Sequence, residues 1–196
     1  MILIGTSALS AQVVTTLAGS GYWAFGNGQG SAASFNSPRG LAVDNDGNVY
    51  VGDSYNHLIR RIDADGNVTT LAGSGFKGQN GAGGFQDGAA ASARFDNPRG
   101  LAVYGNGTVY VVDHINNRIR QITKSGSGNA STWQVTTLAG SGSFAFRDGQ
   151  GTAASFAWPT AVAVDGSGTL YVGDNNNNRI RKITAAGNVT TLAGSR

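Results

Sequence analysis

Three pairs of acidic and amide side chains stand three residues apart in this chain. They are Asp53 and Asn56, Asp113 and Asn116, and Asp174 and Asn177. Carboxylate and amide oxygens that converge on a common axis could ligate a metal ion. The same residue types also bond to backbone amides in tight turns. Because the pairs recur at regular intervals, we interpret them as repeated turns of the architecture and not as one unique metal site.

Arginines follow each of these pairs and form a second repeated pattern. They are Arg60, Arg120 and Arg181, with Arg118 and Arg179 beside two of them. A basic stripe of this kind could meet phosphate groups. No repeated exposed aromatic platform accompanies it, although single-stranded RNA recognition favours one. We therefore expect the arginines to pair with aspartates or to cover the sheet with their aliphatic stems.

Few other residues offer chemistry. His57 and His114 are not at equivalent positions, and neither stands in the His-x-x-x-His spacing of a zinc site. The sequence has no cysteine, which excludes disulfides, Cys-ligated metals and a thiol nucleophile. The glycine-rich residues 26–30 are not followed by the Lys-Ser or Lys-Thr of a phosphate loop. We therefore predict no catalytic residues, no metal ligands and no cofactor.

The stretch 40–74 contains the elements that must position these residues. Its four apolar runs are Leu41–Val43, Val49–Val51, Leu58–Ile62 and Val68–Ala72, separated by turns rich in Asp, Asn and Gly. Short runs of β-branched and aromatic residues between such turns indicate strands. Asp-Gly between two runs indicates a hairpin, because both residues tolerate positive φ. The stretch therefore predicts a four-stranded antiparallel meander.

The meander occurs three times, and a Val-Thr-Thr element gives its period. Thr15 to Thr69 is 54 residues, Thr69 to Thr136 is 67, and Thr136 to Thr190 is 54. Four strands repeated at such a period are the signature of propeller blades. One sheet cannot bury both of its faces alone, so the blades must stack on each other.

The long loops that join the repeats also share a pattern. Each carries a phenylalanine followed three residues later by proline, at Phe35 and Pro38, Phe95 and Pro98, and Phe156 and Pro159. A proline just before a strand is tolerated, since its missing donor is not yet needed. We expect the alanine-rich segment before each phenylalanine to form a single helical turn. We expect the phenylalanine to pack between neighbouring blades.

The repeats resemble a known family. Residues 56–58 are Asn-His-Leu, the tripeptide for which NHL repeats are named. Residues 35–44, FNSPRGLAVD, also fit the wider NHL pattern. The second and third copies have Asn-Arg-Ile where the first has His-Leu-Ile, an ordinary variation for the family. The resemblance covers roughly residues 13 to 195, and it implies an all-β fold, a β-propeller of NHL type.

This resemblance assigns an organisation to the chain. It implies three four-stranded antiparallel blades, at about 40–74, 100–140 and 160–195. Residues 13–20 repeat the last strand of the meander without the other three, so we expect an orphan outer strand there. The three blades then form an open arc or half of a six-bladed ring, which would make the chain a fragment or half of an assembly. Residues 1–12 form the remaining segment.

Strand direction predicts which residues share a face. The second turn of each meander and the long loops between blades lie at one end of the strands. Binding residues concentrate on loops held by a rigid scaffold, so we expect ligands at this loop-rich face. The candidate partner-binding residues there are Arg39, Arg99, Trp23, Trp158, Asp53, Asp113 and Asp174.

The first residues and the overall charge bear on location and partners. Residues 1–12 are apolar and small, and they resemble the back half of a signal peptide with residues 8–11 as a cleavage region. The alternative is an irregular leading segment. A truncated export signal implies an extracellular, periplasmic or cell-envelope location. The net charge of +3 permits an acidic partner without requiring one. No apolar run reaches the length of a transmembrane helix.

These observations favour a non-catalytic scaffold that binds a protein, a small molecule or a glycan through the loop-rich face. The resemblance implies two alternatives. One is part of a metal-dependent propeller enzyme, a lyase or a lactonase-like hydrolase, with Asp or His side chains around a divalent metal on the axis. The other is an RNA-binding surface. A homodimer of two three-bladed copies would complete a ring.

Overall fold

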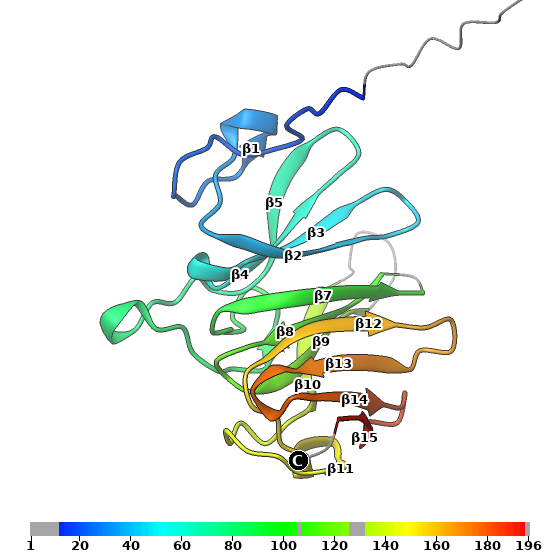
Figure 1. The fold of residues 1–196 in the computed structure, drawn as a ribbon. Helices are drawn as coiled ribbons and strands as arrows, with labels where there is room; N and C mark the ends of the chain where they lie inside the picture. Colours follow the sequence, from blue (N-terminus) through cyan, green and yellow to red (C-terminus); the bar gives the residue numbers. More distant parts are fainter. Residues whose placement is uncertain (1–11, 106, 126–131, 195–196) are drawn as a thin grey trace, which may run out of the picture.

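The computed structural model describes residues 12–105, 107–125 and 132–194, so the predicted leader lies outside the described residues except for Gln12. Three antiparallel sheets follow one another along the chain and fan out as blades (Figure 1). They confirm the predicted all-β propeller arc of three blades. The helices of the described residues include none with the length and hydrophobicity of a membrane span.

The first blade shows how each sheet is built. In spatial order its strands are β1 (Gly28–Gln29), β5 (Asn67–Ala72), β4 (Leu58–Ile62), β3 (Val49–Asp53) and β2 (Pro38–Val43). The last four form the predicted meander. The loop before the blade adds β1 at the outer edge, where Gly28 faces Val68. The prediction of four strands per blade is therefore one strand short, because two residues carry no alternating pattern.

The other two blades repeat this order. The second comprises β6 (Gly88–Ala89), β10 (Thr132–Ala139), β9 (Arg118–Ser125), β8 (Thr108–Asp113) and β7 (Pro98–Tyr104). The third comprises β11 (Gly149–Gln150), β15 (Asn188–Ala193), β14 (Arg179–Ile183), β13 (Leu170–Asp174) and β12 (Pro159–Val164). The innermost strands β2, β7 and β12 lie side by side. Their first residues therefore meet at one end of the arc.

Short 3-10 helices occupy several loops and turns. They are η1 (Gly30–Ala32), η2 (Ser54–Asn56), η3 (Gln79–Gly81), η5 (Gly151–Ala153) and η6 (Asn175–Asn177). The turns η1 and η5 confirm the predicted helical turn before the phenylalanine in two of the three loops. The remaining loop, which precedes the second blade, has a hydrogen-bonded turn at this place instead.

The structure differs from the prediction at residues 13–20, since no strand occurs between residues 12 and 22. The equivalent strand β10 is defined by its pairing with β9. Residues 13–20 have no such neighbour in the described chain, so the strand is not formed. The end of this segment nevertheless makes the same contact as the end of β10. The Gly19 N–H donates to the Gly30 carbonyl at 3.1 Å, as the Gly140 N–H after β10 donates to the Gly151 carbonyl at 3.2 Å.

Two apolar cores fill the space between neighbouring blades. The first joins Tyr50 and Ile59 of the first blade to Leu101 of the second and contains Phe95. The second core lies between the second and third blades and contains Phe156. Both phenylalanine side chains are buried. The prediction that they pack between blades is confirmed.

The innermost strands approach each other so closely that only glycine fits at some positions. A Cβ atom on Gly100 of β7 would lie 2.8 Å from both the Ala161 Cα and the Thr160 carbonyl oxygen of β12. Both obstacles are backbone atoms and cannot rotate away.

The substitution Gly100→Ala should therefore lower the free energy of unfolding by about 1–3 kcal/mol, the usual cost of overpacking. Urea unfolding measures this loss. Gly166→Ala is the matched control, because nothing lies within 4 Å of a Cβ at Gly166. Equal losses for the two variants would show that the close approach of the strands is not the cause.

Candidate functional site

The three repeated aspartates lie inside the structure. One Asp53 oxygen accepts the Asn36 backbone N–H at 2.7 Å, and the other accepts the Asn56 amide at 2.9 Å and the Arg60 guanidinium at 2.8 Å. Equivalent contacts surround Asp113 and Asp174. All three side chains are fully buried. They therefore fix the turn after the second strand of each meander and are closed to a binding partner.

Each repeated arginine lies between two phenylalanine rings. The Arg120 guanidinium carbon is 4.8 Å from the centre of Phe85 and 5.0 Å from that of Phe95. The same group donates to Asp113 at 2.6 Å. Arg60 lies in this way between Phe25 and Phe35, and Arg181 between Phe146 and Phe156. Ion pairing, hydrogen bonds and cation–π contacts together allow a charge to be buried. The expected pairing of these arginines with aspartates is confirmed.

A different group of residues surrounds a hollow at the loop-rich end. Arg39 of β2, Arg99 of β7 and Thr160 of β12 occupy equivalent positions in the three blades and line a space of about 520 Å³. The next residue along each strand is small, which keeps this space open. Among the described residues, no carboxylate lies within ion-pair distance of either arginine.

The two arginines create an excess of positive charge. Burial lowers the pKa of Arg99, and the neighbouring Arg39 guanidinium lowers this pKa further. Burial also lowers the pKa of His114, whose Nδ1 lies 2.9 Å from the Pro159 carbonyl oxygen, and the charges of Arg99 and Arg39 add to the lowering. Like charges held together without an acidic partner attract an anion.

Trp158 places an aromatic ring at the same end of the strands. Its centre is 6.0 Å from that of His114 and 5.1 Å from that of Phe144. The backbone φ of Trp158 is +45°, a value that bulky residues rarely adopt. The backbone N–H of Trp158 donates to the Asn117 side-chain oxygen at 2.8 Å, and this hydrogen bond holds the backbone conformation. The equivalent Ser37 and Asn97 also have positive φ, so this backbone conformation belongs to the repeat, and it is the partly exposed ring that sets Trp158 apart.

The residues predicted to share the loop-rich face thus separate into groups. Arg39, Arg99 and Trp158 lie at the end of the inner strands. Trp23 lies in the loop before the first blade, bridged to Phe35, and is almost fully exposed. The remaining three are the buried aspartates. The candidate surface therefore comprises only the two arginines and the two tryptophans.

Three residues at this end were not predicted from the sequence, namely Tyr55, His114 and Thr160. The Arg39 guanidinium carbon lies 6.0 Å from the centre of the Tyr55 ring. His114 lacks the spacing of a zinc ligand, and Thr160 carries no charge, so neither stands out in the sequence. An alignment of the three repeats would have singled out Thr160, because it stands where the other copies have arginine.

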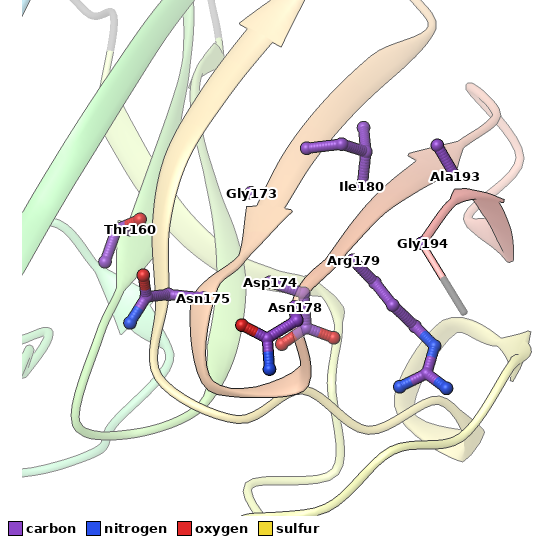
Figure 2. A pocket seen from close by; sticks show the side chains of 9 residues that line it. All are labelled: Thr160, Gly173, Asp174, Asn175, Asn178, Arg179, Ile180, Ala193 and Gly194. Atoms are coloured by element: carbon purple, nitrogen blue, oxygen red, sulfur yellow. The ribbon is translucent and has the colours of Figure 1, made fainter. Parts of the chain in front are cut away.

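A second hollow lies on the open face of the third blade, as Figure 2 shows. Its volume is about 370 Å³, and Asn175, Asn178, Arg179 and Ile180 are among the residues that line it. The corresponding faces of the first and second blades are covered by the blade that follows each of them.

Comparisons with known proteins agree with this architecture. The family model for the NHL repeat matches residues 35–62 and 156–183. Protein SUPPRESSOR OF QUENCHING 1, chloroplastic, of Arabidopsis thaliana is 39% identical over 97 residues, which cover 49% of this chain and 9% of that protein. NHL repeat-containing protein 2 of Gallus gallus is 51% identical over 53 residues, covering 26% of this chain and 7% of that protein. This chain therefore spans only a small part of these relatives.

A solved structure shows a similar fold. The auxiliary nutrient binding protein from Bacteroides thetaiotaomicron superposes with a TM-score of 0.59 at 24% identity, covering 84% of this chain and 39% of that one. This likeness supports the arrangement of the blades. Together with the two matched repeats and the buried Asp–Asn–Arg contacts of every blade, it leads to one conclusion. The chain contains NHL repeats, matched at residues 35–62 and 156–183, and folds as a three-bladed β-propeller arc.

Proposed function

We propose that this protein is a non-catalytic binding scaffold, whose loop-rich end takes an anionic group between Arg39 and Arg99. The observation that carries the proposal is the pair of arginines beside an open hollow, with no carboxylate paired to either among the described residues. Guanidinium groups bind carboxylates and phosphates through two parallel hydrogen bonds.

The neighbouring residues suit such a ligand. The Arg99 Nε donates to the Asn97 side-chain oxygen at 3.0 Å, which orients the guanidinium group. The Thr160 hydroxyl can donate a further hydrogen bond from the third blade. Tyr55 offers aromatic surface beside Arg39, and Trp158 offers a partly exposed ring at the same end of the strands. A ligand that combines an acidic group with an apolar body would use both kinds of contact.

The enzymatic alternative requires acidic or imidazole side chains that converge on one point. Within residues 12–105, 107–125 and 132–194, no group of three or more His, Cys, Asp or Glu could hold a metal. The repeated aspartates are engaged with arginines and asparagines in every blade. These residues therefore favour the scaffold role over the metal-dependent enzyme.

Calorimetric titration with inorganic tripolyphosphate tests the proposal. Removing one arginine from the pair, by Arg39→Gln or Arg99→Gln, should weaken binding by roughly 10- to 100-fold, since a hydrogen bond to a charged group contributes about 1.5–3 kcal/mol. Added salt should weaken binding by the wild-type protein as well.

The matched control is Arg61→Gln, which removes the same charge near the opposite end of the strands. The Arg61 guanidinium donates to Asn48 there at 2.7 Å. This variant should bind tripolyphosphate as the wild type does. An equal loss of affinity in Arg61→Gln would mean that net charge alone attracts the anion, and the proposed site would be discarded. Tight binding of a single-stranded oligonucleotide that Arg39→Gln leaves unchanged would favour the RNA-binding alternative.

A further inference from the structure

We infer that a hollow between the first and second blades, at the end of the strands opposite to Arg39 and Arg99, binds a neutral saccharide. Its volume is about 420 Å³, within the roughly 300–1,000 Å³ typical of small-molecule pockets. Both walls of the hollow belong to neighbouring blades inside the chain. The inference is independent of the anion site at the loop-rich end.

The second blade supplies an aromatic ring to this hollow. Trp133 lies on β10 directly opposite Lys124 of β9, so both side chains lie on the same face of the sheet, and both line the hollow. The Trp133 ring also packs against the apolar core of the junction, which fixes its position. The equivalent positions of the first and third copies are Gly66 and Gly187. Trp133 is therefore a departure from the repeat and not a part of its common architecture.

The hollow is open because small residues stand where the second junction contains a tyrosine ring. Tyr104 of the second blade has the position that Asp44 has in the first. In the second junction, a Cβ at Gly168 would lie 3.3 Å from the Tyr104 ring, and the Tyr104 hydroxyl donates to the Gly166 carbonyl at 3.5 Å. At the corresponding Gly107 of the first junction, no Asp44 atom lies within 4 Å of such a Cβ. The space that a tyrosine fills in one junction is thus left free in the other.

The polar side chains of the first blade are held in place before a ligand arrives. One Asp44 carboxylate oxygen accepts the Tyr50 hydroxyl at 3.0 Å and the Asn48 amide at 2.8 Å. The Asn48 side-chain oxygen in turn accepts the Arg61 guanidinium at 2.7 Å. Groups that are already ordered lose less conformational entropy when they bind a ligand.

The charges around the hollow balance, which indicates the class of ligand. Asp44 and Asp46 supply negative charge, and Arg61 and Lys124 supply an equal positive charge. A site without excess charge favours a neutral ligand over an anion. Sugar hydroxyls both donate and accept hydrogen bonds, so they can pair with the carboxylates and with the cationic groups at once. The C–H groups on the face of a sugar ring pack against an aromatic face, which is electron-rich, and Trp133 supplies the aromatic ring.

Nuclear magnetic resonance with neutral tetrasaccharides tests the inference. The probes are cellotetraose, mannotetraose, xylotetraose and maltotetraose, each added at millimolar concentration to the labelled protein. At least one of them should shift the amide signals of residues 44–48, 105, 107 and 124 and the indole N–H signal of Trp133. This indole signal is recognised among those of the three tryptophans because Trp133→Phe removes it.

Two substitutions at the site give the expected loss of affinity. Trp133→Ala should weaken binding of the active tetrasaccharide by about tenfold or more, whereas Trp133→Phe keeps an aromatic ring and should retain most of the affinity. Asp46→Ala removes an exposed acceptor and should weaken binding by roughly 2- to 10-fold. Because Trp133 also packs on the core, Asp46→Ala provides the test in a protein whose core is intact.

The matched control is Tyr22→Ala, which removes an exposed aromatic ring from the loop before the first blade and should leave tetrasaccharide binding unchanged. Added tripolyphosphate should not change the affinity for the tetrasaccharide, so the two sites can fail separately. The inference would be overturned if none of the tetrasaccharides shifted the signals around the hollow. It would also be overturned if Trp133→Ala and Asp46→Ala bound as tightly as the wild type, or if Tyr22→Ala lost as much affinity as they do.

Discussion

Replacing Arg120 by methionine will lower the free energy of unfolding by about 3–5 kcal/mol, the cost of leaving a buried charge without its partner. The Asp113 carboxylate is fully buried and receives the Arg120 guanidinium at 2.6 Å. The methionine side chain fills a similar space, but it has no positive charge to neutralise the Asp113 carboxylate. The backbone carbonyl of Gln86, which Arg120 contacts at 2.8 Å, would also lose its donor. Urea unfolding of the purified protein measures the loss.

Two milder changes in the same blade serve as controls. Arg118→Met removes a guanidinium that stacks 3.8 Å from the centre of Phe85 without pairing with a carboxylate, and it should cost about 1 kcal/mol. Asp87→Asn removes an acid that is partly exposed, and it should cost less than about 1 kcal/mol. The first blade already has Asn27 at this position. If Arg120→Met costs no more than Arg118→Met, the buried pair does not have the structural role assigned to it.

The second large effect concerns the contact between blades. Phe156→Ala should lower the free energy of unfolding by about 3–5 kcal/mol, the usual cost of truncating a buried phenylalanine. The ring is fully buried in the core between the second and third blades. Its loss would leave a cavity that the rigid strands on either side cannot close. Thermal or urea unfolding followed by circular dichroism measures the change.

Phe146→Ala separates burial from cation–π contact, because both rings face the same arginine. Arg181 lies 4.9 Å from the centre of Phe146 and 5.1 Å from that of Phe156, but Phe146 is 37% exposed. The Phe146 variant should therefore lose about 1 kcal/mol. Equal losses of unfolding free energy in Phe156→Ala and Phe146→Ala would mean that the arginine contact, and not the apolar core, stabilises the junction.

The repeated parts of the fold were predictable because each local signal agrees with the others. The alternation of the apolar runs, the Asp-Gly turns and the period of the Val-Thr-Thr element all indicate the same four-stranded unit. Repetition also indicated that Asp53 and its equivalents are structural. The prediction of arginine pairing followed from having an acid and a base in every copy, and the contact between Asp53 and Arg60 confirms it.

The parts that depend on neighbours were not predictable in this way. Strand β1 is two residues long and exists only because β5 offers it an edge. Residues 13–20 have the sequence of a strand but no neighbouring strand to pair with. The candidate binding site departs from the repeat, with Thr160 and Trp158 in place of an arginine and a small polar residue. A search for what recurs passes over such positions.

The scaffold proposal rests on which end of the strands meets the ligand, and a map of amide chemical shifts tests this most directly. With inorganic tripolyphosphate added to the labelled protein, the largest shifts should occur in residues 36–40, 96–100 and 157–161, around Arg39 and Arg99. The Arg99→Gln variant should lose these shifts and keep the spectrum of the folded protein. Shifts confined to the turns at residues 44–48 and 165–169, at the opposite end of the strands, would contradict the account.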